Sequence, residues 1–180
     1  MIVCVGAVTV WVVVATSPSN DSTGSNAAIR GTVAIGKPAP TFAHDDLDGE
    51  PLDLASYRGR PLIIAFWASW CEPCREEFAL LAALQKRMSA DEVAIVGVTF
   101  QDIDSDSRNF VREHGGNWPN IGDRDGSIAK AYGVRALPVT FFVNADGVVV
   151  SKVFGLRSRT QLDRELARIM KPSLIPGARS

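Results

Sequence analysis

The feature that most constrains this chain is segment 61–88, in which a buried strand leads directly into a cysteine pair and a helix. Residues 61–68 (PLIIAFWA) form an unbroken apolar run, which is typical of a strand covered on both faces. Cys71 and Cys74 follow, and from Glu72 to about Met88 the apolar residues recur at helical spacing. The segment therefore predicts an interior strand of a sheet and a helix that begins at the cysteines.

The rest of the chain continues the alternation of strands and helices. A second buried strand is expected over 93–100, and helices are expected from about Ser105 to His114 and from Gly126 to Tyr132. Strands 138–144 and 148–154 flank an Asp-Gly turn, which predicts a hairpin. A last helix from Ser158 to about Met170 would bury Leu162, Leu166 and Ile169. The order predicts an α/β fold, with a central mixed sheet and helices on both faces.

The 180 residues divide into four expected parts: a signal-like or anchor-like apolar segment (1–16), a flexible linker (17–33), one domain (34–171) and a tail (172–180). As a helix, residues 2–15 would span about 21 Å, less than the roughly 30 Å of a hydrocarbon core. No basic residue precedes Arg30, which departs from the secretory pattern, so we hypothesise that the true start lies upstream. The alternative is a buried core strand.

Composition narrows the classes of partner and of cysteine chemistry. The formal net charge is −1, so bulk charge indicates neither a nucleic acid nor an anionic membrane surface as partner. Three cysteines, Cys4, Cys71 and Cys74, are too few for a disulfide framework. Cys4 precedes most of the apolar run, so we do not interpret it as a site of lipid attachment. The Cys71/Cys74 pair needs a local explanation.

Thiol–disulfide exchange explains the pair best. Cys71 is expected at a helix N-terminus, where unpaired N–H groups and the helix dipole favour a thiolate. Glu72 would oppose that effect, and Pro73 suits a first-turn position because its missing N–H would have had no partner. Two intervening residues bring the sulfur of Cys74 within bonding distance. One nucleophile and one nearby thiol are what exchange through a mixed disulfide requires.

Metal sites and a purely structural disulfide are weaker interpretations. A structural zinc site needs four ligands, but there is no second CxxC, and His44 and His114 are isolated in the sequence. Residues 102–107 (DIDSDS) imitate a calcium loop, but they lack its glycine and indicate a capped helix start instead. A structural disulfide closing so small a loop would add little stability. The sequence thus predicts no metal and no cofactor.

Five segments resemble the thioredoxin superfamily, in particular its membrane-tethered TlpA-like, ResA-like and CcmG-like branch. They are residues 36–42 (GKPAPTF), which resemble that branch's opening strand, the lead-in 46–61, the active-site segment 66–78 (FWASWCEPCREEF), the strand segment 95–102 (IVGVTFQD) and residues 132–150 (YGVRALPVTFFVNADGVVV). The resemblance covers about residues 35–170. It implies a thioredoxin-like three-layer sandwich.

By that resemblance, Cys71 is the attacking thiol, Cys74 is the resolving thiol, and Pro138 is a cis-proline that seats a partner's backbone. The implied substrate-binding residues are Trp70, Glu72, Pro73, Leu137 and Pro138. Glu77 matches a cavity glutamate of ResA-like proteins and could carry the proton of Cys74, although a solvated helix glutamate is an equal alternative. Thioredoxins proper carry a buried aspartate where this chain has Ala65.

The resemblance implies an extracytoplasmic thiol–disulfide oxidoreductase held at a membrane by its N-terminal segment. Its partners would be cysteine-containing exported proteins, among them apocytochrome c, and a transmembrane thiol electron donor. Three alternatives remain open: an exported disulfide-forming oxidase, a peroxiredoxin-like thiol peroxidase with antioxidant activity, and a redox-inert binding module. Against the peroxidase, Ala68 stands where that family has a threonine or serine.

Overall fold

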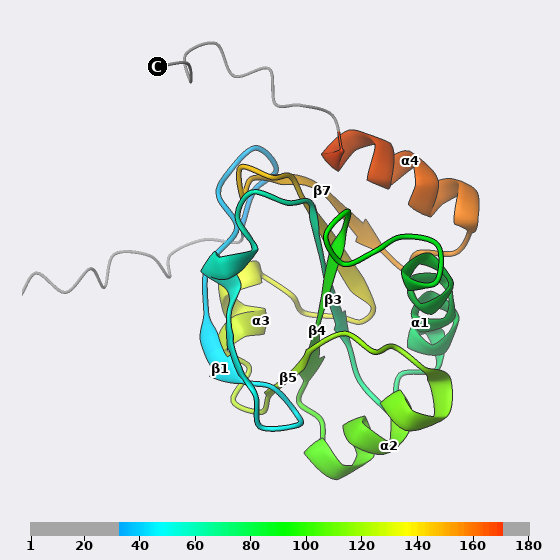
Figure 1. Ribbon diagram of the computed structural model, residues 1–180. Coiled ribbons are helices and arrows are strands. Elements are labelled where there is room, and N and C mark those ends of the chain that lie inside the picture. The colour runs from blue at the N-terminus through cyan, green and yellow to red at the C-terminus, as the bar shows by residue number, and fades with distance from the viewer. Residues whose placement is uncertain (1–32, 171–180) are drawn as a thin grey trace, which may run out of the picture.

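The computed structural model describes residues 33–170, and its centre is a five-stranded mixed sheet (Figure 1). The strands are β3 (Leu62–Trp67), β4 (Ala94–Phe100), β5 (Asn120–Asp123), β6 (Val139–Val143) and β7 (Val149–Phe154), in the order β5-β4-β3-β6-β7. β3, β4 and β5 are parallel, whereas β6 and β7 run antiparallel to their neighbours. β3 is the middle strand and is buried along its whole length, as its unbroken apolar run predicts.

Helices cover both faces of this sheet, which confirms the predicted thioredoxin-like architecture. Helices α1 (Glu72–Gln85), α2 (Asp104–His114) and α4 (Arg159–Ile169) lie on one face, and α3 (Ser127–Tyr132) lies on the other (Figure 1). Alternate residues of β3 point into the two resulting cores. Ile63, Ala65 and Trp67 pack with α1, α2 and α4, whereas Leu62, Ile64 and Phe66 pack with α3.

The helices begin and end close to the predicted positions. Helix α1 ends at Gln85, three residues before the expected Met88, which still packs against the core from the turn that follows. In α4, Ser158 accepts a hydrogen bond from Gln161 N–H at 3.2 Å as the N-cap. The predicted stripe of Leu162, Leu166 and Ile169 is buried.

Residues 36–42, expected as an opening strand, do not form one. Pro38 makes a single bridge to Val148, and the first regular strands are a separate hairpin of β1 (Ala43–Asp45) and β2 (Pro51–Asp53), followed by the short 3-10 helix η1 (Leu54–Tyr57). Two prolines in residues 36–42 lack the N–H that a continuous ladder needs. Strand β5, which no pattern predicted, forms the edge of the main sheet beside β4.

The predicted signal or anchor segment (1–16), nearly all of the linker (17–33) and the tail (172–180) lie outside the described residues. Among residues 33–170, no helix is long and apolar enough to cross a membrane.

Candidate active site

The two cysteines lie at the junction between the central strand β3 and helix α1. Strand β3 ends at Trp67, and Cys71 is the N-cap residue of α1, with its N–H donating to Ala68 O at 3.1 Å. The side chain of Cys71 makes no capping hydrogen bond. Its sulfur therefore lies at the positive end of the helix dipole without serving the helix as an acceptor.

The two cysteines are joined by a disulfide, with a Cα–Cα distance of 5.3 Å. Both are buried, Cys71 at 5% and Cys74 at 1% exposure, and both belong to the core that α1 shares with α2 and α4. Pro73 lies in the first turn of α1, as predicted, where it interrupts no helical hydrogen bond. The bonded pair is thus built into the packed start of the helix, not held on a free loop.

A groove of about 580 Å³ runs alongside the pair. Glu72 and Pro73, the two residues between the cysteines, form part of one wall, and Leu137 and Pro138 line the groove with them. The Leu137–Pro138 peptide bond is cis, as the resemblance implied. Four of the five predicted substrate-binding residues therefore meet in one groove. The fifth, Trp70, is not among the lining residues and projects into solvent with 62% exposure.

The groove also contains residues that the sequence did not single out. They are Glu76, Ala136, Phe154, Gly155, Leu156 and Arg157. Phe154 is the end of β7 and is largely exposed, an unusual placement for a large apolar ring. Its ring contacts Lys152 Nζ at 4.9 Å from the centroid. An exposed phenylalanine at the end of a strand has no sequence signature, because only the fold brings it to this groove.

Glu77 is buried, with 3% exposure, one helical turn beyond Cys74. Its Oε1 accepts a hydrogen bond from Thr140 Oγ1, and its Oε2 accepts one from Leu156 N–H at 2.7 Å. Burial raises the pKa of Glu77, and the two hydrogen bonds offset only part of that effect. The alternative of a solvated helix glutamate is therefore wrong.

Ala65 faces Thr140 across the β3–β6 ladder, so the hydroxyl that binds Glu77 stands opposite the alanine. The strand itself supplies no acid at position 65, and the buried carboxyl beside Thr140 comes from helix α1 instead. Glu72, by contrast, is exposed and pairs with Arg75 at 3.2 Å, an interaction of the kind that contributes little to stability.

The residues considered for metals are dispersed in the fold. His44 lies in β1 and His114 ends α2, and both are exposed. Within residues 33–170, no three His, Cys, Asp or Glu side chains gather in a way that could hold a metal ion. Asp102, the first residue of the calcium-like stretch, uses its carboxylate to bind neighbouring backbone and hydroxyl groups.

Comparison with known proteins identifies the family of this chain. Residues 35–152 match the AhpC/TSA family. The chain is 33% identical to the thiol-disulfide oxidoreductase ResA of Bacillus thuringiensis subsp. konkukian over 135 residues, which cover 75% of this chain and 78% of that protein.

Two solved structures extend the likeness to the fold. A thiol:disulfide interchange protein of the thioredoxin family from Chlorobium tepidum TLS is 27% identical, with a TM-score of 0.69, over 77% of this chain and 99% of that one. A secreted Mycobacterium tuberculosis disulfide oxidoreductase homologous to E. coli DsbE is 29% identical, with a TM-score of 0.64, over 70% of this chain and 94% of that one. With its disulfide at the start of α1, the chain belongs to the AhpC/TSA family as a ResA-like thiol–disulfide oxidoreductase whose active-site pair is Cys71 and Cys74.

Proposed function

We propose that this oxidoreductase reduces disulfides of exported proteins on the extracytoplasmic side of a membrane, and that the haem-binding cysteine pairs of apocytochrome c are among its substrates. The observation that carries the proposal is the Cys71–Cys74 disulfide at the N-terminus of α1, beside a groove lined by cis-Pro138. The resemblance to the ResA-like branch supports the cytochrome c substrates. The secreted relative supports the location.

In the first step, the reduced enzyme attacks a disulfide of its substrate. The Cys71 thiolate forms a bond to one substrate sulfur, the substrate S–S bond breaks, and the second substrate sulfur leaves as a thiolate that takes a proton from water. The N-terminal N–H groups of α1 stabilise the attacking thiolate. The product is a mixed disulfide between Cys71 and the substrate.

In the second step, Cys74 resolves the mixed disulfide. Its thiol loses a proton, its sulfur attacks Cys71 Sγ, and the first substrate sulfur leaves as a thiolate. Glu77, one turn further along α1, is the proton acceptor that we propose, since a carboxyl with a raised pKa exchanges protons near neutral pH more readily than a solvated one. Two electrons have then passed to the substrate, and the enzyme holds the Cys71–Cys74 disulfide.

The groove supplies the place where the substrate chain binds. We propose that Pro138 and Leu137 seat the substrate backbone, that Pro73 and Glu72 form the opposite wall, and that the exposed ring of Trp70 contacts the substrate outside the groove. A transmembrane thiol donor would return the disulfide to the dithiol by the reverse sequence of steps. Residues 1–16 would hold the enzyme at the membrane beside this donor.

Substitution of each cysteine tests the assignment. Cys71→Ser is expected to abolish reduction of a protein disulfide, whereas Cys74→Ser is expected to accumulate a mixed disulfide, which mass spectrometry of the trapped complex would identify. Cys4→Ser serves as the control and should leave turnover unchanged. Turnover by Cys71→Ser at the wild-type rate would refute the proposal. Binding of a cysteine-containing peptide without turnover in the wild type would support a redox-inert module.

Equilibration with glutathione tests the direction of electron flow. A reductase is expected to have a reduction potential well below that of the glutathione couple. A difference of about 30 mV between the two potentials corresponds to about 1.4 kcal/mol in the free energy of exchange. A potential far above that couple would show a disulfide-forming oxidase. Consumption of hydrogen peroxide at a rate that exceeds protein reduction would show a peroxidase.

A further inference from the structure

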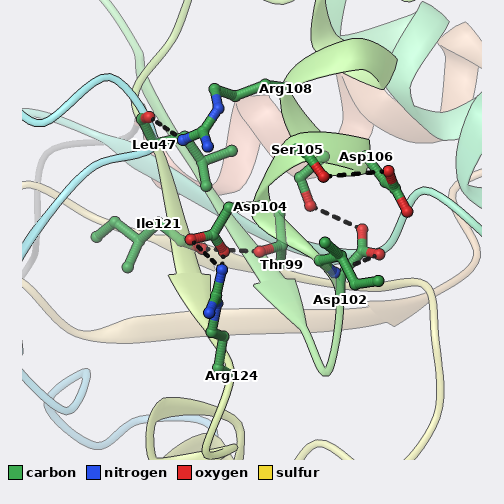
Figure 2. Close-up of polar contacts among 11 residues, drawn as sticks. Leu47, Thr99, Asp102, Asp104, Ser105, Asp106, Arg108, Ile121 and Arg124 are labelled. Atoms are coloured by element: carbon green, nitrogen blue, oxygen red, sulfur yellow. Dashed lines mark hydrogen bonds and ion pairs between the residues drawn. The ribbon is translucent and has the colours of Figure 1, made fainter.

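We propose that Asp102 is a positioning residue for thiol–disulfide exchange, because its carboxylate holds the loop that carries Cys71 in place at the start of α1. The residue follows strand β4, on the polypeptide segment that leads into α2 (Figure 2). It does not belong to the groove or to the cysteine motif. This inference rests on the proposed attacking role of Cys71.

The carboxylate of Asp102 is buried, with 8% exposure, and four donors converge on it. Oδ2 accepts hydrogen bonds from Ser69 N–H and from Ser107 Oγ, both at 2.7 Å. Oδ1 accepts hydrogen bonds from Ser69 Oγ and from Ile103 N–H, both at 2.9 Å. Two of the four donors thus belong to Ser69, and the other two belong to the start of α2.

Ser69 lies in the short turn that presents the attacking cysteine. The turn runs from Ala68, whose carbonyl accepts the N–H of Cys71, to the N-cap of α1. Fixing both the N–H and the hydroxyl of Ser69 leaves this turn little freedom to rotate. The sulfur of Cys71 therefore keeps its place beside the first N–H groups of α1, which stabilise its thiolate.

The backbone next to Asp102 adds an independent observation. Gln101 has a φ of 51°, and among residues 33–170 it is the one residue other than glycine with a positive φ. A side chain in this left-handed region strains the backbone, and such strain persists only where the surrounding contacts enforce it. The side chain of Gln101 is exposed, so its own packing does not explain the conformation. Backbone contacts enclose it instead: Gln101 N–H donates to Asp123 O at 3.3 Å, and Asp102, which follows directly, is held by its four hydrogen bonds.

The donor pattern requires a carboxylate at this position. Each oxygen of Asp102 takes one backbone N–H and one hydroxyl. In Asp102→Asn, one side-chain atom becomes an NH₂ group. Hydroxyls can turn to accept from NH₂, but a backbone N–H cannot. Whichever way the amide is oriented, one backbone N–H, of Ser69 or of Ile103, faces another donor.

A carboxylate that merely stabilised the start of α2 would make the same contacts, so the test must separate stability from thiol chemistry. Ser69→Ala and Ser107→Ala form a matched pair. Each removes one hydroxyl hydrogen bond to Asp102, but Ser69 lies on the cysteine turn and Ser107 lies within α2. In the full chain carrying Cys74→Ser, the pH dependence of Cys71 alkylation by iodoacetamide gives the thiol pKa, and thermal unfolding of each variant gives its stability.

For Asp102→Asn we expect the Cys71 pKa to rise by about one unit, which slows alkylation at neutral pH by up to about tenfold. Ser69→Ala should also raise the Cys71 pKa and should slow alkylation by about twofold to threefold. Ser107→Ala should lower the unfolding temperature without changing the alkylation rate. If Asp102→Asn does not fold, the serine pair decides alone. Equal alkylation rates in Ser69→Ala and Ser107→Ala would overturn the proposal. Turnover by Cys71→Ser would instead refute the proposed function, separately from this inference.

Discussion

Glu77 is a carboxyl group enclosed by the core on the active-site face of the sheet, and its ionisation is coupled to folding. In the unfolded chain, Glu77 loses its proton near its ordinary pKa of 4.5, whereas burial raises its pKa in the folded protein. Between these two values the folded state binds more protons than the unfolded state. The contribution of Glu77 to the free energy of unfolding is therefore complete below pH 4.5 and decreases as pH rises to the folded pKa.

Glu77→Gln is expected to remove this pH dependence. The amide oxygen can still accept from Leu156 N–H, and its NH₂ can donate to Thr140 Oγ1. Urea unfolding of the oxidised wild type and variant between about pH 4 and pH 8 measures the effect. The stability difference should move in favour of the variant as pH rises. Parallel stability curves over that whole range would contradict the assignment of a raised pKa.

Single residues of the site differ in how far the sequence predicts them. Cys71, Cys74 and Pro138 stand in a recognisable motif. The helical spacing puts Glu77 on the apolar face, but it left a buried and a solvated glutamate as equal alternatives, and the structure shows burial. Phe154 has no such pattern, and the acidic stretch that begins with Asp102 indicated a helix start but no contact with the cysteine turn. Their positions depend on where strand ends meet in space, and no local periodicity carries that information.

At the scale of elements, β4 and β5 pack together because one of their paired positions has no side chain. Gly97 of β4 pairs with Asn120 of β5, and the amide of Asn120 lies over it. There Asn120 Oδ1 accepts a hydrogen bond from the indole N–H of Trp67 at 3.1 Å, which joins three strands through one buried contact. A Cβ at position 97 would overlap Asn120 Oδ1 and lie 2.8 Å from Trp67 Nε1.

Gly97→Ala should therefore lower the free energy of unfolding by about 2–4 kcal/mol, through overpacking and loss of a buried hydrogen bond. Gly122→Ala is the control, because the close neighbour of its added Cβ would be Asp104 Oδ1, at 2.8 Å, on a side chain that can move, and Leu47 Cδ2 would lie at an ordinary contact distance of 3.7 Å. The control should cost less than about 1 kcal/mol, since it disturbs a partly exposed ion pair between Asp104 and Arg124. Urea unfolding measures both variants, and equal losses would contradict the role given to Gly97.

Helices and strands with a clear pattern of apolar residues could be predicted from the sequence, whereas the short strand β5 could not. The buried strands β3 and β4 each contain an unbroken apolar run. Helices α1 and α4 each have more than ten residues in which apolar side chains recur at helical spacing. Strand β5 has four residues, one of them glycine, and forms because the edge of β4 is available to it. Its strand conformation is imposed by tertiary pairing, which outweighs local preference.

At the scale of the whole molecule, the redox potential of the Cys71–Cys74 pair depends on the difference in folding stability between the oxidised and the reduced protein. Folding lowers the potential of the Cys71–Cys74 pair only if the oxidised protein is more stable than the reduced protein, and about 1.4 kcal/mol of such a difference corresponds to about 30 mV. The N-terminus of α1 stabilises the thiolate of Cys71 and so favours the reduced form. Glu72, adjacent to Cys71, opposes that thiolate, and so would Glu77 when ionised.

We therefore expect the oxidised protein to unfold at a higher urea concentration than the reduced protein, which is the order that a reductase requires. The disulfide itself favours the oxidised form by restricting the unfolded chain. Although a loop this small adds little stability, a weakly stabilised thiolate would not reverse that sign. Unfolding of the air-oxidised and dithiothreitol-reduced chain measures the difference, with Cys71→Ser as a control that should show none between the two conditions. Greater stability of the reduced form would assign the enzyme to disulfide formation, because the folded protein would then gain stability when it oxidises a partner and its own disulfide becomes a dithiol.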